Sequence, residues 1–139
     1  SDCVPAQGVS RHLTGTPPIL ALAALECGVD LMLQAGVDKV TEKSARLGDI
    51  FIQLVRQQLG GTDIEVISPH EADGRGAQVC LKSNYAEHLV TALEKSGVVM
   101  DYRPPDIMRL GLAGLFVRYQ DLWDVVQALA EDYAALKGR

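Results

Sequence analysis

The chain of 139 residues has the length of one domain, and its 47% hydrophobic and 22% charged residues are typical of a globular protein. The net charge of −5, without a basic run, argues against nucleic acid as a partner, because a phosphate backbone would be repelled. The longest apolar run, 19–25, is too short to cross a bilayer and no signal peptide is visible, so no membrane partner is predicted.

The first half of the chain is predicted to be an arm followed by two helices. Residues 1–15 lack periodicity and are expected to form an N-terminal arm or loop. Apolar residues spaced by three and four predict a helix over 17–36, which Gly36 ends. A second helix, with one apolar and one charged side, is predicted over 38–59, and the pair Gly60–Gly61 ends it.

The second half changes to a period of two. Four segments with this period are predicted to be strands: 64–67, 77–82, 98–102 and 107–110. A helix over 85–95, capped by Ser83 or Asn84, separates the first two strands from the last two, and an amphipathic helix over 121–136 follows. This order predicts an α+β fold, with a mostly antiparallel sheet of three or four strands packed against helices.

Cysteine and histidine positions argue against disulfides and metal ligation. The cysteines Cys3, Cys27 and Cys80 are odd in number and form no C-x-x-C pair, which favours a reduced, cytoplasmic setting without zinc. The three histidines lack the spacing of metal ligands, so we expect no metal site. The chain begins at Ser1 rather than at a methionine, which leads us to expect a fragment or a processed product.

The segment Gly15-Thr16-Pro17-Pro18 is the first candidate for binding. Thr16 is predicted to be the N-cap of the first helix, with Pro17 at the first helical position. Free N–H groups at a helix start can hold a phosphate, with the Thr16 hydroxyl as a further donor. The pattern alone favours a plain cap, because most such caps bind nothing.

The second candidate is Arg109, which stands between apolar residues in the predicted strand Ile107–Leu110. An arginine in apolar surroundings needs an anionic partner, and its planar fork suits a carboxylate. That carboxylate can belong to a ligand or to an Asp or Glu of the chain, and the pattern does not decide between them. No nucleophile elbow, phosphate-binding loop or dinucleotide fingerprint is present, so no catalytic residue is assigned.

Several segments resemble the C-terminal part of kynureninase, a pyridoxal-phosphate enzyme of fold type I, the aspartate-aminotransferase fold. The similar stretches are GTPPILALAALECGVDLM, KSARLGDIFIQLV, ISPHEADGRGAQVCL, SGVVMDYRPPDIMRLGL and RYQDLWDVVQAL. They cover nearly the whole chain in the order of the family. The resemblance implies an arm over 1–15 and, over 16–139, the small C-terminal domain with the helix that leads into it.

The resemblance implies a parent hydrolase of tryptophan catabolism and NAD biosynthesis that converts L-kynurenine into anthranilate and L-alanine. In such homodimeric enzymes the cofactor ring is the electron sink, and a lysine of the large domain carries it. None of the five lysines here lies in a matching motif: Lys39, Lys43, Lys82, Lys95 and Lys137. The resemblance therefore implies that the large domain is absent and that this chain alone is inactive.

Two residues match functional positions of the family. Thr16 matches the residue that reaches the cofactor phosphate in the site of the neighbouring subunit, and Arg109 matches the arginine that binds the α-carboxylate of the substrate. One departure is Gly114-Leu115-Phe116, where the family commonly has Pro-Leu-Tyr. The competing interpretation is a freestanding small-molecule-binding or regulatory α+β module with Arg109 at its binding site.

Overall fold

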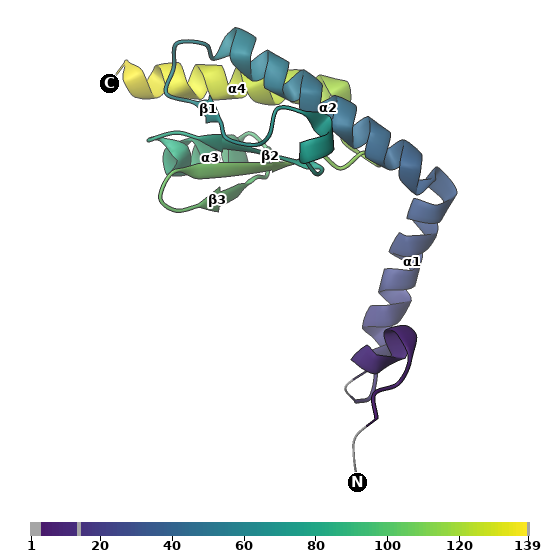
Figure 1. Ribbon diagram of the computed structural model, residues 1–139. Helices are drawn as coiled ribbons and strands as arrows, with labels where there is room; N and C mark the ends of the chain where they lie inside the picture. Colours follow the sequence, from purple (N-terminus) through teal and green to yellow (C-terminus); the bar gives the residue numbers. More distant parts are fainter. Residues whose placement is uncertain (1–3, 14, 139) are drawn as a thin grey trace. The chain divides into compact units, whose positions relative to one another are not determined.

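The computed structural model describes residues 4–13 and 15–138 (Figure 1). The chain divides into two compact units, one up to Ala35 and one from Gly36. The described elements are, in order, η1 (Gly8–His12), α1 (Ile19–Ala35), α2 (Val37–Gln58), β1 (Glu65–Val66), η2 (Ala72–Gly74), β2 (Gln78–Lys82), α3 (Ala86–Lys95), β3 (Asp101–Arg103), β4 (Ile107–Gly111) and α4 (Tyr119–Lys137), where η denotes a 3₁₀-helix.

The first unit departs from the predicted arm and helix start. A 3₁₀-helix occupies Gly8–His12, so the arm is not entirely a loop. Helix α1 begins at Ile19, and its first backbone bond runs from Leu22 N–H to Pro18 O (3.0 Å). The prediction that Thr16 is the N-cap and Pro17 the first helical residue is therefore wrong. Both residues precede a proline, which disfavours the helical conformation.

Helix α1 is mostly apolar, with Glu26, Asp30 and Gln34 as its polar residues at spacings of four, and it has no buried residue. Ile19, Leu20 and Leu33 are each at least 67% exposed. Among the described residues no single helix is long and apolar enough to cross a membrane, and α1 with α2 meets those criteria only as a broken pair.

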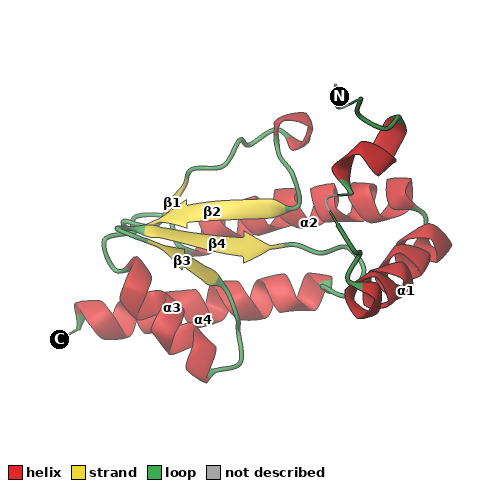
Figure 2. Ribbon diagram, turned by 90° about the horizontal axis from the view of Figure 1, so that it is seen from below, coloured by secondary structure: helices red, strands yellow, loops and turns green. Residues whose placement is uncertain are grey.

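The second unit contains an antiparallel sheet with its helices packed on one face. The strand order is β1-β2-β4-β3, so β2 and β4 are central and β1 and β3 form the edges. Figure 2 shows the strands in front of α2 and α4, and the other face of the sheet carries none of the unit's helices. This arrangement confirms the predicted α+β fold.

A single apolar core lies between the sheet and the helices. Its residues follow the two periods of the sequence: α2 contributes positions three and four apart, and each central strand contributes alternate positions. The side chains buried to 0% exposure include Leu47, Phe51, Val79, Leu81, Leu89, Leu93, Met108, Val126 and Leu129. The predicted helices over 38–59, 85–95 and 121–136 are confirmed to within two residues at each end.

The strand predicted over 98–102 is wrong at its start, because β3 begins only at Asp101. Gly97 has a positive φ of 86° and donates to Glu94 O (3.1 Å), and Val98 N–H donates to Leu93 O (3.0 Å). These two bonds form the Schellman motif that ends α3. The Val98 N–H is thereby bound to the helix and is not part of the sheet ladder.

The start of α3 is tied to the segment before β1 through Asp63. The Asp63 carboxylate accepts bonds from the Ser83 hydroxyl (3.1 Å) and from Asn84 N–H (2.9 Å), while Ser83 Oγ accepts Tyr85 N–H (3.1 Å). The N-cap residue is Tyr85, not the predicted Ser83 or Asn84, and its side chain makes no capping bond. Desolvation raises the pKa of Asp63, but these hydrogen bonds outweigh it and hold the pKa below its ordinary value.

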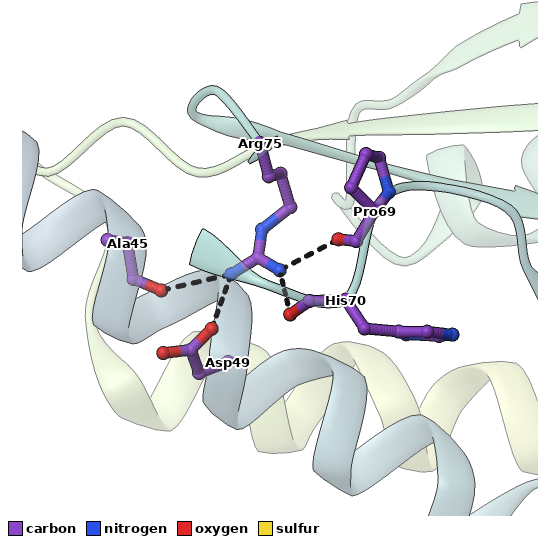
Figure 3. A network of polar contacts seen from close by, with 5 residues as sticks. All are labelled: Ala45, Asp49, Pro69, His70 and Arg75. Atoms are coloured by element: carbon purple, nitrogen blue, oxygen red, sulfur yellow. Dashed lines mark hydrogen bonds and ion pairs between the residues drawn. The ribbon is translucent and has the colours of Figure 1, made fainter. Parts of the chain in front are cut away.

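Arg75 fastens the connection between β1 and β2 to helix α2 (Figure 3). Its Nη1 donates to Pro69 O (3.0 Å) and His70 O (2.8 Å), while Nη2 donates to Ala45 O (3.3 Å) and Asp49 Oδ1 (2.5 Å). The Arg75 side chain is only 2% exposed. Its guanidinium is therefore occupied within the fold.

Candidate functional site

Arg109 lies on the face of the sheet that the unit's helices leave uncovered, here called the open face. Side chains alternate along β4, so Met108 and Leu110 point into the core while Arg109 points the other way. The two apolar residues next to Arg109 in the sequence therefore belong to the opposite face, whereas Ile107 shares the face of Arg109. The Arg109 side chain is 30% exposed.

Asp101 of β3 is the cross-strand partner of Arg109 and binds its guanidinium. Asp101 Oδ2 accepts Arg109 Nε at 2.8 Å and also accepts Arg109 Nη2. The hydrogen bonds from Arg109 hold the pKa of the Asp101 carboxyl below its usual range. The internal ion pair that the sequence left open is thus present in the fold.

Arg103 joins this pair from the end of β3. Its Nε and Nη2 both lie 3.1 Å from the same Oδ2 atom of Asp101. Asp101 is thus the shared ion-pair partner of two arginines, and the three side chains together carry a net charge of one positive unit. A positively charged group on an exposed sheet face is suited to binding an anion.

The remaining residues of the open face surround this group with mixed charges. On β2, Cys80 is the Cα partner of Arg109, and Lys82 Nζ lies 3.5 Å from Asp106 Oδ2. On β1, Glu65 is paired with Lys82. The described residues contain no cluster of three or more His, Cys, Asp or Glu side chains that could hold a metal ion.

Thr16 lies in the first unit, where it lines a hollow of about 190 Å³ just before α1. The other lining residues are His12, Leu13, Gly15, Pro17, Pro18 and Leu22. Because the first α1 bond is donated by Leu22, the N–H groups of Ile19, Leu20 and Ala21 have no partner within the helix. The hollow is thus lined by the residue with a hydroxyl, Thr16, and by the prolines that precede α1, and none of the described residues that line it carries a carboxylate.

The segment after β4 approaches α2 closely at Gly114. Gly114 N–H donates to the buried Ser44 Oγ (3.0 Å), and a Cβ at Gly114 would lie 2.6 Å from Val40 O. A proline here would lose this N–H and meet that carbonyl, so the family's usual Pro-Leu-Tyr does not fit this backbone. The adjacent Phe116 is 76% exposed.

Sequence reasoning assigned no role to Asp101, Arg103 or Ser44. Asp101 and Arg103 lie in SGVVMDYRPPDIMRLGL, one of the stretches that carry the resemblance, and this membership was their only signal. Thr16 belongs to the first compact unit and Arg109 to the second.

Comparisons with known proteins identify the family of the chain. The family described as kynureninase C-terminal domain matches residues 40–129. The kynureninase of Pseudomonas fluorescens is 38% identical over 127 residues, and that of Burkholderia mallei is 34% identical over the same length. Each alignment covers 91% of this chain and 30% of the relative, so the chain spans less than a third of the length of these relatives.

Solved structures share the fold. An acetylornithine aminotransferase from Elizabethkingia anophelis has a TM-score of 0.58 and 22% identity, over 73% of this chain and 25% of its own. An ornithine aminotransferase from Toxoplasma gondii, whose active site holds pyridoxal phosphate at partial occupancy, has a TM-score of 0.57 and 19% identity, over 75% of this chain and 25% of its own. The fold is thus that of fold-type I enzymes, and the sequence match shows that the chain belongs to the kynureninase C-terminal domain family.

Proposed function

We propose that this chain is the C-terminal domain of a pyridoxal-phosphate-dependent hydrolase that converts L-kynurenine into anthranilate and L-alanine. The observation that carries the proposal is the 38% identity to a kynureninase over 91% of the chain. The position of Arg109 on the open face of the sheet, accessible to a ligand, supports it.

In this proposal Arg109 binds the α-carboxylate of kynurenine. Its guanidinium is planar and can grip a carboxylate with two parallel hydrogen bonds. The surplus positive charge that it forms with Arg103 and Asp101 attracts an anion even though Asp101 is already bound. At 30% exposure, Arg109 can reach a ligand without the full cost of a buried charge.

Thr16 is proposed to bind the cofactor phosphate in the site of the neighbouring subunit. The position of Thr16 supports this role, because it lines a hollow just before α1, whose first N–H groups have no partner within the helix. The partial positive charge of the helix N-terminus favours a phosphate at that place. These residues hold the cofactor and take no covalent part.

Pyridoxal phosphate, when bound, supplies the electron sink for the reaction. We propose that the lysine carrying it belongs to a large domain outside this chain, so that this chain alone is inactive. Its own residues then bind and orient the ligand, with Arg109 at the carboxylate and Thr16 at the phosphate. The complete enzyme is proposed to be a homodimer, because Thr16 would serve the neighbouring subunit. A cytoplasmic location is proposed from the cysteines, which form no C-x-x-C pair.

The experiment replaces Arg109 by lysine in the full-length enzyme and measures steady-state hydrolysis of L-kynurenine. Lysine keeps the charge but loses the fork, and a charge-assisted hydrogen bond contributes about 1.5–3 kcal/mol, so KM should rise roughly ten- to a hundred-fold. Cofactor affinity should stay near that of the wild type. The matched control is Arg46→Lys, since the Arg46 side chain is 66% exposed and its one ion pair among the described residues is with Glu42.

Two results would contradict the proposal. A lower melting temperature with unchanged KM would show that Arg109 only braces the sheet. Failure of the wild-type full-length protein to release anthranilate from kynurenine would reject the hydrolase itself, and binding of small acids by the chain alone would then favour the freestanding module.

A further inference from the structure

The Arg109 guanidinium has two edges that can bind a carboxylate, and the fold uses one of them. Nε and Nη2, which form the side edge, both donate to Oδ2 of Asp101. Within the described residues, Nη1 donates to no partner. Because the guanidinium is planar and rigid, fixing the side edge also fixes the direction of the end edge formed by Nη1 and Nη2.

We propose that Asp101 is a positioning residue for Arg109, and that it holds the end edge ready for the α-carboxylate of the substrate. This inference rests on the proposed function, since it assumes that Arg109 binds that carboxylate. Without Asp101 the long arginine side chain would sample several rotamers, and binding would have to order it. Asp101 is well placed to prevent this, because it is the direct cross-strand partner of Arg109.

Arg103 keeps the group attractive to an anion. If Asp101 faced Arg109 alone, the two charges would cancel and the approaching carboxylate would meet a neutral pair. Arg103 donates to the same Oδ2 atom, so the three side chains keep one positive charge. Asp101 can therefore orient Arg109 without neutralising the site.

An opposite interpretation makes Asp101 a competitor that occupies Arg109 and must be displaced by the substrate. The two roles differ in sign. Removing a positioning carboxylate weakens substrate binding, whereas removing a competitor strengthens it. The Michaelis constant therefore separates them, provided that folding is monitored on the same preparation.

The test is Asp101→Asn in the full-length enzyme, with L-kynurenine as substrate and an analogue of kynurenine without its carboxylate as competitive inhibitor. KM should rise about ten-fold with kcat within about two-fold of the wild type, because an oriented charge-assisted contact is weakened. The inhibition constant of the carboxylate-free analogue should not change, since it makes no use of Arg109. The control is Asp106→Asn, a carboxylate of the same hairpin that pairs with Lys82 at 3.5 Å.

A fall in KM would overturn the inference in favour of the competitor. If Arg109→Lys raises KM but Asp101→Asn leaves KM unchanged, the inference is overturned while the proposed function stands. An equal rise in KM for the substrate and in the inhibition constant of the carboxylate-free analogue would also overturn it, because the defect would then not depend on the carboxylate. If Asp101→Asn does not fold, Asp101→Glu takes its place, and the same selective rise for the carboxylate-bearing ligand is required.

Discussion

Replacing Arg75 by methionine tests the claim that this arginine holds the β1–β2 connection on α2. Methionine matches the arginine stem as far as the Nε position and is apolar, so the variant removes the guanidinium and keeps the buried stem. It leaves Pro69 O and His70 O without their donor, and Asp49 without its cation. The decrease in the free energy of unfolding should therefore measure the contribution of these hydrogen bonds and of the ion pair.

The size of the loss follows from these contacts. Each hydrogen bond to a carbonyl of Ala45, Pro69 or His70 contributes about 1 kcal/mol net. The pair with Asp49 adds only about 1 kcal/mol, because that carboxylate is 46% exposed and water screens it. Burial of the methionine side chain offsets about 1 kcal/mol of this. We expect the free energy of unfolding to fall by about 3 kcal/mol.

The measurement is urea and thermal unfolding of the 139-residue chain, followed by far-UV circular dichroism. For a domain of this size, about 3 kcal/mol corresponds to a melting temperature lower by about 12 °C or more. The matched control is Arg46→Met on α2, where the side chains of the pair with Glu42 are 66% and 64% exposed. That control should lose less than about 0.5 kcal/mol.

A loss for Arg75→Met no larger than that of the control would refute the reasoning. It would mean that water replaces the guanidinium at the loop carbonyls without cost, so that the loop is not held by this side chain.

Two further changes test contacts elsewhere in the second unit. Gly114→Ala should lower the free energy of unfolding by about 2 kcal/mol, because its Cβ would lie 2.6 Å from Val40 O and 2.9 Å from Ser44 Oγ; unchanged urea unfolding would contradict that close approach. Asp63→Asn should lose about 1–2 kcal/mol at neutral pH, because the amide cannot replace both carboxylate acceptors. Since the folded pKa of Asp63 is lowered, this stabilisation is present above the unfolded pKa of about 3.9 and is lost as the pH falls through the folded pKa. If the difference in unfolding free energy between variant and wild type persisted in acid, it would argue against the carboxylate.

The sequence predicted the order and type of the major elements because their periods are local properties. The change from period 3.6 to period 2 after Gly60–Gly61 located the sheet, and the glycines located the ends of helices. The start of β3 was mispredicted because Val98 is apolar and β-branched, yet its N–H is bound to Leu93 O in the cap of α3. The start of α1 was mispredicted because Pro17 itself precedes a proline.

The site was predictable only in part, since it depends on sheet register. Arg109 was recognised as an arginine that needs a carboxylate, but its partner follows from the pairing of β3 with β4. Side chains alternate along β4, so Arg109 and its neighbours Met108 and Leu110 lie on opposite faces. That Arg109 is accessible follows only once one face of the sheet is known to lack helices. The acceptors of Arg75 come from α2 and from the loop before η2, and no local pattern links these segments.

Helix α1 has a consequence for the dynamics of the chain. It buries none of its residues, so its 17 residues receive no stabilisation from a core of this chain. Isolated helices of about this length are marginal in water. Its amide protons should therefore exchange with solvent through local opening, whereas those of α2, α3, α4 and the central strands exchange only when the common core opens. A deuterium-exchange profile would then divide the chain at Gly36, and slow exchange in α1 would appear only once another surface covers it.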